Sequence, residues 1–94
     1  MNANAAKVKR FRKAQQQKVR DLKEASPCAD CGHSFPYYVM DYHHRDAADK
    51  EFKLSRALSN TMAWSRILAE VAKCDLLCAN CHRVREHEHR RVFQ

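Results

Sequence analysis

The chain has 94 residues, with 18 Lys or Arg against 11 Asp or Glu, so its formal net charge at pH 7 is +7. A chain this short buries only about 60–65% of its unfolded surface, which excludes one large core. The excess of positive charge favours an anionic partner such as nucleic acid. No apolar run approaches the roughly 20 residues that span a bilayer, so we expect a soluble, cytoplasmic protein without a membrane partner.

Residues 1–25 are rich in Ala and Gln and contain no Gly or Pro, which predicts a helix. Two interpretations of this basic N-terminal arm stay open: it lies along phosphates, or it is a solvated helix. Pro27 ends the helix, because the residue before a proline avoids the α region. Residues 26–94 then form the domain itself. The basic residues of the arm are Lys7, Lys9, Arg10, Arg12, Lys13, Lys18, Arg20 and Lys23.

Two Cys-x-x-Cys pairs, Cys28 with Cys31 and Cys78 with Cys81, predict a structural zinc site, because four thiolates suit tetrahedral Zn²⁺. The spacing between the pairs exceeds the roughly 15–20 residues common in such sites. The longer loop costs only about 1 kcal/mol, against an apparent zinc-binding free energy of about 10–16 kcal/mol. An iron tetrathiolate, disulfides and a thiol redox motif are the alternatives. Gly32 follows the first pair, where a positive φ favours glycine.

Residues 37–44, Tyr-Tyr-Val-Met-Asp-Tyr-His-His, are rich in β-formers and predict a strand that ends at two histidines. Neighbouring strand residues point to opposite faces, so His43 and His44 have different roles. Arg45 and Asp46 end the strand. His33 reads as a surface imidazole, since four thiols are already available for a metal.

Residues 47–60 predict a loop and a short helix, and an amphipathic helix follows at about 61–73. Asn60 or Thr61 is the expected N-cap of that helix. Cys74 reads as a small buried hydrophobe. The anchors expected in the first segment are Phe52, Leu54 and Leu58, and those expected in the helix are Trp64, Ile67, Leu68 and Val71.

A basic helix is predicted to begin at His82, directly after the second cysteine pair, with Glu86 and His89 on the same face. Glu86 can be a metal ligand beside His82, or it can pair with a neighbouring arginine. Two imidazoles, one from the helix and one from the strand end, can hold a divalent ion while the third acts as a base. Phosphodiester hydrolysis needs this combination, with arginines on the flanking phosphates.

In these motifs the chain resembles the HNH endonucleases of the ββα-metal fold, in particular small phage-type members with zinc knuckles. The resemblance covers about residues 28–85. It implies an α+β fold in which a small ββα-metal motif carries the structural four-cysteine zinc site, accompanied by the basic N-terminal helix and the amphipathic helix. The stretches that carry the resemblance are Cys28-x-x-Cys31-Gly32, the run Met40 to Asp46, the run Lys73 to Cys78, and Cys78-Ala79-Asn80-Cys81-His82-Arg83.

The resemblance implies that His44 is the general base and that His43 and His82 hold Mg²⁺, Mn²⁺ or a similar ion. Arg45 and Arg83 are the expected substrate-binding residues. The implied activity is nicking or cutting of DNA to leave 5′-phosphate and 3′-hydroxyl ends. The chain would act as a monomer or homodimer in the host cytoplasm if phage-encoded, and phage packaging proteins are candidate partners.

One position departs from the family pattern, because the middle Asn of the motif has no match in this chain. Lys73, Cys74 and Asp75 occupy that region. Either Asp75 or Asn80 then takes over the tethering role, or the site is weakened. The alternative function is a non-catalytic zinc-knuckle module that binds nucleic acid or acts as an adaptor.

Overall fold

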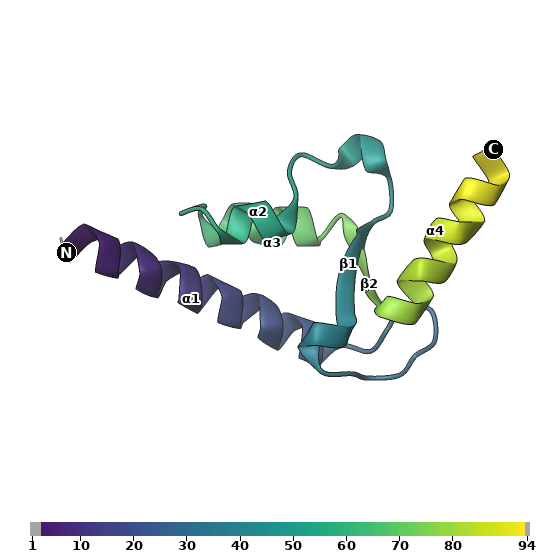
Figure 1. The fold of residues 1–94 in the computed structure, drawn as a ribbon, viewed down its shortest axis with the longest axis horizontal. Coiled ribbons are helices and arrows are strands. Elements are labelled where there is room, and N and C mark those ends of the chain that lie inside the picture. Colours follow the sequence, from purple (N-terminus) through teal and green to yellow (C-terminus); the bar gives the residue numbers. More distant parts are fainter. Residues whose placement is uncertain (1–2, 94) are drawn as a thin grey trace.

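The computed structural model describes residues 3–93, which form an α+β fold with a two-stranded antiparallel sheet and four α-helices (Figure 1). The sheet lies at the centre, and α1 and α4 extend to opposite ends of the longest dimension, which measures 51 Å (Figure 1). The elements in chain order are α1 (Ala3–Ala25), β1 (Met40–His44), α2 (Leu54–Leu58), α3 (Trp64–Val71), β2 (Cys74–Cys78) and α4 (Ala79–Phe93).

Helix α1 confirms the predicted N-terminal helix over the residues that are described. Its buried side chains are Gln15 and Val19. The Gln15 amide donates from Nε2 to the carbonyl of Met62 at 2.9 Å, which ties the helix to the segment before α3. The N-terminal half of α1 extends past the other elements (Figure 1). Across the described residues, no helix combines the length and apolar character needed to cross a bilayer.

The sheet pairs β1 with β2, with Met40 opposite Cys78 and His44 opposite Cys74. The predicted strand at 37–44 is too long, because Tyr37–Val39 form a 3₁₀ turn closed by a hydrogen bond from the Val39 N–H to the Pro36 carbonyl. Strand β2 ends opposite Met40, where the chain turns into α4. Residues 37–39 therefore have no partner strand.

Two small apolar clusters replace a single core, as the chain length predicts. The first surrounds the cysteines and has Cys28, Met40, Leu77 and Cys78 at its centre. The second joins α1, α2 and α3 through Val19, Ala57 and Ile67. Tyr42 of β1 packs against the second cluster and connects it to the sheet. The predicted anchors that pack there are Phe52, Leu54, Leu58, Trp64 and Val71.

Helix α3 is shorter than the predicted helix, and the expected cap is wrong. Ala63 occupies the N-cap position without a side-chain hydrogen bond. Asn60 instead belongs to the turn that closes α2, where its N–H donates to the Ala57 carbonyl. Leu68, expected in the core, is 40% exposed, whereas Glu70 is 1% exposed. The buried face of α3 therefore includes Ile67 and Glu70 and leaves out Leu68.

Helix α4 starts at Ala79, three residues before the predicted start at His82. The second cysteine pair therefore spans the junction between β2 and α4. This junction fixes the first turn of α4 against the end of the sheet, where the candidate site lies.

Candidate functional site

The four cysteines of the two Cys-x-x-Cys pairs form one cluster. Their sulfur atoms all lie within 4.8 Å of one another, and the Sγ atoms of Cys31 and Cys78 are 4.0 Å apart. A tetrahedral zinc with Zn–S bonds of about 2.3 Å requires sulfur separations of about 3.8 Å. A disulfide would need about 2.05 Å, and all five cysteines are free thiols. The donor set and its spacing therefore fit a metal ion such as zinc.

The first cysteine turn is closed by backbone hydrogen bonds. The N–H of Cys28 donates to the His33 carbonyl, and the N–H of Gly32 donates to the Cys28 carbonyl, both at 2.9 Å. Gly32 has φ +77°, a conformation that side chains disfavour, which confirms the prediction for this glycine. A further hydrogen bond, from the Ala29 N–H to the Leu76 carbonyl, fastens the turn to β2.

Proton affinity differs sharply across the thiol cluster. Burial raises the pKa of Cys28, but hydrogen bonds with the backbone of Cys31 and Cys78 outweigh it and lower that pKa to about 6. Hydrogen bonding to Cys78, together with burial, raises the pKa of Cys81 to about 12. One thiol of the cluster therefore loses its proton readily, whereas the loss of further protons is disfavoured. A divalent cation would supply the balancing charge.

Cys74 and His33 lie outside this cluster. Cys74 is buried, and its Sγ donates to the Glu70 carbonyl at 3.5 Å, in agreement with its predicted role as a small buried side chain. His33 is exposed and contacts the edge of the Phe35 ring.

Arg85 of α4 joins the first cysteine turn to β2, a role that the sequence did not reveal. Its guanidinium donates to both carboxylate oxygens of Asp30, at 2.8 and 2.6 Å, and to Asp75 at 2.8 Å. The hydrogen bonds from Arg85 lower the pKa of both carboxyl groups. This bidentate pairing holds α4 in place beside the four-cysteine cluster.

His43 of β1 and His82 of α4 place their imidazole rings in contact. The two rings lie 5.1 Å apart between centroids and meet edge to face. Nδ1 of His82 is 3.2 Å from Asp41, and Nε2 is 3.3 Å from Glu86. A neutral imidazole has one N–H and one nitrogen lone pair, and a lone pair repels a carboxylate oxygen. The two carboxylate contacts of His82 are therefore both favourable only when a second proton or a cation is present. His82 and its two carboxylate neighbours therefore supply the donors and the negative charge that attract a cation.

The His43 ring is poorly suited to carry a proton. Burial, then the positive charges of His82 and Arg85, lower its pKa below the ordinary 6.5. A neutral ring keeps a lone pair, which is the form in which histidine binds metals.

His44 points to the other side of β1, as strand geometry predicts. Its Nε2 lies 2.6 Å from Oε2 of Glu70, and its side chain is 12% exposed. The Glu70 carboxylate also accepts hydrogen bonds from the Lys73 Nζ at 3.0 Å and from the Glu51 N–H at 3.1 Å. Burial raises the pKa of Glu70, but the hydrogen bonds from His44 and Lys73 outweigh it, so the net shift is downward.

The ionised Glu70 can only accept, so the His44 proton sits on Nε2 and a neutral ring has its lone pair on Nδ1. Of the two candidates for the tethering role, Asp75 accepts hydrogen bonds from Arg85 and from Arg45, the residue after His44, whereas Asn80 is exposed. Sequence reasoning missed Glu70. The available signal was its position three residues after Ile67, on the apolar side of the predicted helix.

The two predicted substrate-binding arginines differ in their surroundings. Arg45 donates to the carbonyls of Ala72 and Cys74, and its side chain is 52% exposed. Arginine has five N–H donors, so these contacts leave some for a phosphate. Arg83 is exposed on α4.

Within residues 3–93, the four cysteines are the one group of three or more side chains found close enough to hold a metal ion together. Outside that group, His43 and His82 supply two imidazoles in mutual contact, with carboxylates at both ring nitrogens of His82. Comparison of the chain with protein-family models, with curated proteins and with solved structures gave no match in any of the three.

Proposed function

We propose that this protein is a metal-dependent HNH endonuclease that hydrolyses DNA phosphodiester bonds. The observation that carries the proposal is the 5.1 Å approach of the His43 ring on β1 to the His82 ring on α4, with His44 next along the strand. The succession of β1, β2 and α4, with cysteine pairs before β1 and at the β2–α4 junction, supports a ββα-metal arrangement. The positive net charge supports a polyanionic substrate.

In this proposal His43 and His82 would hold the divalent ion, and Asp41 and Glu86 contact the two ring nitrogens of His82. Such an ion supplies charge stabilisation at the phosphate and at the leaving oxygen. His44 takes a proton from the attacking water at Nδ1, because its Nε2 is committed to Glu70. The water oxygen bonds to phosphorus as the bond to the 3′ oxygen breaks, and the 3′ oxygen takes a proton from solvent, which leaves a 5′-phosphate and a 3′-hydroxyl.

The test is cleavage of supercoiled plasmid by the zinc-loaded protein with Mg²⁺ or Mn²⁺, compared with His44→Ala and His87→Ala. His87 is an exposed histidine on α4 and serves as the matched control. We expect nicked or linear product from the wild type and from His87→Ala, with loss by His44→Ala of about 10²- to 10⁴-fold in rate. Equal rates for His44→Ala and the wild type would reject His44 as the base.

A second candidate function is a zinc module that binds nucleic acid or acts as an adaptor without catalysis. The observation that favours it is the absence, within the described residues, of a second group of three metal-binding side chains beside the cysteines. This candidate predicts one bound zinc, no further ion at His43 and His82, and no cleavage of plasmid with any divalent ion.

A further inference from the structure

His44 lies where two surface hollows meet. One hollow, of about 400 Å³, has three lysines on its wall and is here called the lysine hollow. The other, of about 380 Å³, is lined by Arg45 and Arg90 and is here called the arginine hollow. The lysines are Lys23, Lys50 and Lys53. Both hollows have His44 in their lining, so a strand that occupied both would pass His44.

The lysine hollow is lined by four parts of the chain, which are α1, β1, the segment from Lys50 to Leu58, and α4. Lys23 comes from the C-terminal half of α1, and Lys50 and Lys53 come from the loop before α2. Lys23 lies 5.8 Å from the centre of the Tyr42 ring, which holds it against β1. His82 and Asp41 also line the hollow.

The floor of the lysine hollow is apolar and aromatic, which a site for inorganic phosphate alone would not need. Val19, Leu54 and Leu58 contribute aliphatic surface, and Tyr42 contributes a ring. Lysine ammonium groups suit phosphate oxygens, whereas an apolar floor suits a sugar or a base. The combination fits a nucleotide within a strand.

Each hollow also has one carboxylate, Asp41 in the lysine hollow and Glu86 in the arginine hollow. Both carboxylates contact the His82 ring, Asp41 at Nδ1 and Glu86 at Nε2, so their charge is directed toward His82. The basic side chains on the outer walls therefore remain the groups that attract a phosphate.

We propose that the lysine hollow is a binding site for one unpaired nucleotide of the substrate strand, next to the phosphate that is cut at His44. The strand then crosses His44 and leaves through the arginine hollow. A base in the hollow cannot at the same time pair with a complementary strand. The proposal thus names the substrate class as nucleic acid with a single-stranded stretch at the cleavage site.

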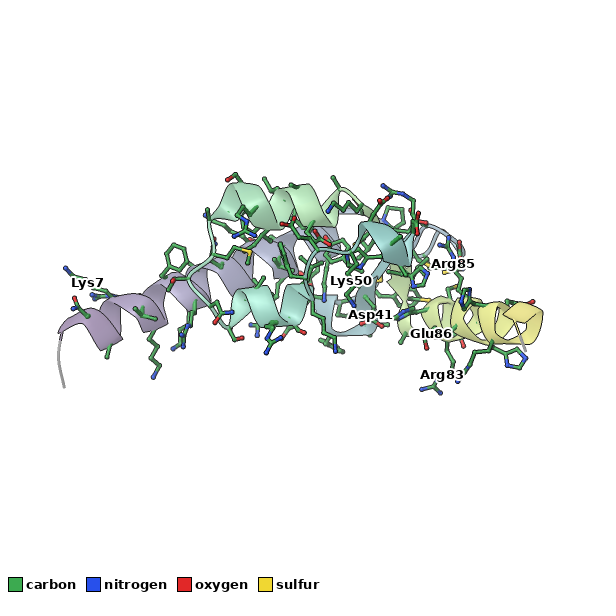
Figure 2. All side chains as sticks on the ribbon, turned by 90° about the horizontal axis from the view of Figure 1, so that it is seen from above. Lys7, Asp41, Lys50, Arg83, Arg85 and Glu86 are labelled. Atoms are coloured by element: carbon green, nitrogen blue, oxygen red, sulfur yellow. The ribbon has the colours of Figure 1, made fainter. Side chains whose placement is uncertain are left out.

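This inference rests on the proposed function for the position of the cut, but binding can be measured separately from cleavage. The probe is a fluorescent single strand of about eight nucleotides, with a duplex of the same sequence for comparison. Fluorescence anisotropy is recorded on zinc-loaded protein without added divalent ion, over a series of salt concentrations. The variants are Lys50→Gln/Lys53→Gln and the control Arg56→Gln/Arg66→Gln, which removes the same charge from exposed side chains outside both hollows. The N-terminal arm is unchanged in both variants, and Figure 2 shows Lys7 of that arm remote from Lys50 and Asp41.

We expect Lys50→Gln/Lys53→Gln to weaken single-strand binding about 50-fold at about 50 mM salt and to lower the salt slope by about 1.4, since each phosphate contact contributes about 0.7. The control pair should change single-strand binding less than about threefold, and duplex binding should depend less on Lys50 and Lys53 than single-strand binding does. Lys50→Arg/Lys53→Arg should bind the single strand like the wild type.

Equal weakening by the two Gln pairs, a larger effect on the duplex than on the single strand, or no single-strand binding by the wild type would overturn the proposal. If the wild type cleaves plasmid but single-strand binding does not depend on Lys50 and Lys53, the binding-site proposal is rejected and the proposed nuclease function stands. If single-strand binding depends on these lysines but no plasmid is cleaved, the binding site stands and the nuclease function is rejected.

Discussion

The Nε2 atom of His44 lies 2.6 Å from Oε2 of Glu70, a carboxylate that is 1% exposed and 26 residues away along the chain. A buried charge persists only where it is paired and hydrogen-bonded. Lys73 and the Glu51 backbone supply the other contacts. Glu70 thus connects α3 and the loop before α2 to the end of β1, and it sets the orientation of the His44 ring.

Replacing Glu70 by Gln should lower the plasmid-cleavage kcat by about 10- to 100-fold, the usual cost of losing a group that orients a reactive side chain. KM should change much less, because Glu70 is buried away from the substrate. The kcat and KM of the zinc-loaded variant give the test.

The matched control for that prediction is Glu51→Gln, which makes the same chemical change at an exposed side chain. The nitrogen-15 shifts of the His44 ring should report a proton on Nε2 in the wild type and a changed pattern in Glu70→Gln. Equal kcat values for the two Gln variants, with unchanged ring shifts, would exclude an orienting role for Glu70.

The local features of the fold could be predicted because each rests on neighbouring residues. Two tight cysteine turns, the positive φ of Gly32 and the alternation of His43 and His44 follow from spacing and backbone geometry. Helix α1 follows from a segment of helix-forming residues without Gly or Pro. These predictions did not depend on which distant segments of the chain pack together.

Other features depend on distant parts of the chain and could not be predicted in this way. Tyr37–Val39 leave the strand because β2 ends opposite Met40. Leu68 is exposed and Glu70 is buried because α3 turns its face toward His44 and Lys73. The Arg85 bridge exists only once β2 and the first cysteine turn meet.

Substituting a zinc ligand should destabilise the protein far more than substituting the fifth cysteine. Cys31→Ser should reduce the bound zinc below one per chain, and chelation of the wild type should unfold it, because metal binding contributes folding free energy. Cys74→Ser should retain one zinc, since Cys74 lies outside the cluster. Zinc content by mass spectrometry and thermal midpoints by circular dichroism measure both effects. Equal zinc loss in the two variants would contradict the assignment of the ligands.

The buried face of α3 can be checked with two adjacent aliphatic residues. Ile67 is 0% exposed and lies in the second apolar cluster, whereas Leu68 is 40% exposed. Ile67→Ala should lower the free energy of unfolding by about 2–5 kcal/mol, and Leu68→Ala by less than about 1 kcal/mol. Urea titrations at constant zinc concentration give both values. The reverse order would mean that α3 presents the other face.

Removing residues 1–13 should weaken duplex binding without unfolding the rest. The five basic residues removed belong to neither apolar cluster. Helix α1 is held to the rest of the protein by Gln15 and Val19, which both remain. The slope of log binding constant against log salt should fall by up to about 4.5, at about 0.9 per phosphate contact. Binding measured over a salt series gives the slope, and an unchanged slope would show that the arm is only solvated. The residues removed include Lys7, Lys9, Arg10, Arg12 and Lys13.

The central claim is that β1 and α4 hold a divalent ion beside His44, and Mn²⁺ titration of the zinc-loaded protein tests it most directly. Electron paramagnetic resonance should detect one bound Mn²⁺ per chain in the wild type and in His87→Ala. His43→Ala and His82→Ala should each weaken that binding by at least about tenfold, as loss of a ligand requires. No bound Mn²⁺ in the wild type, or equal affinity in all four proteins, would contradict the claim.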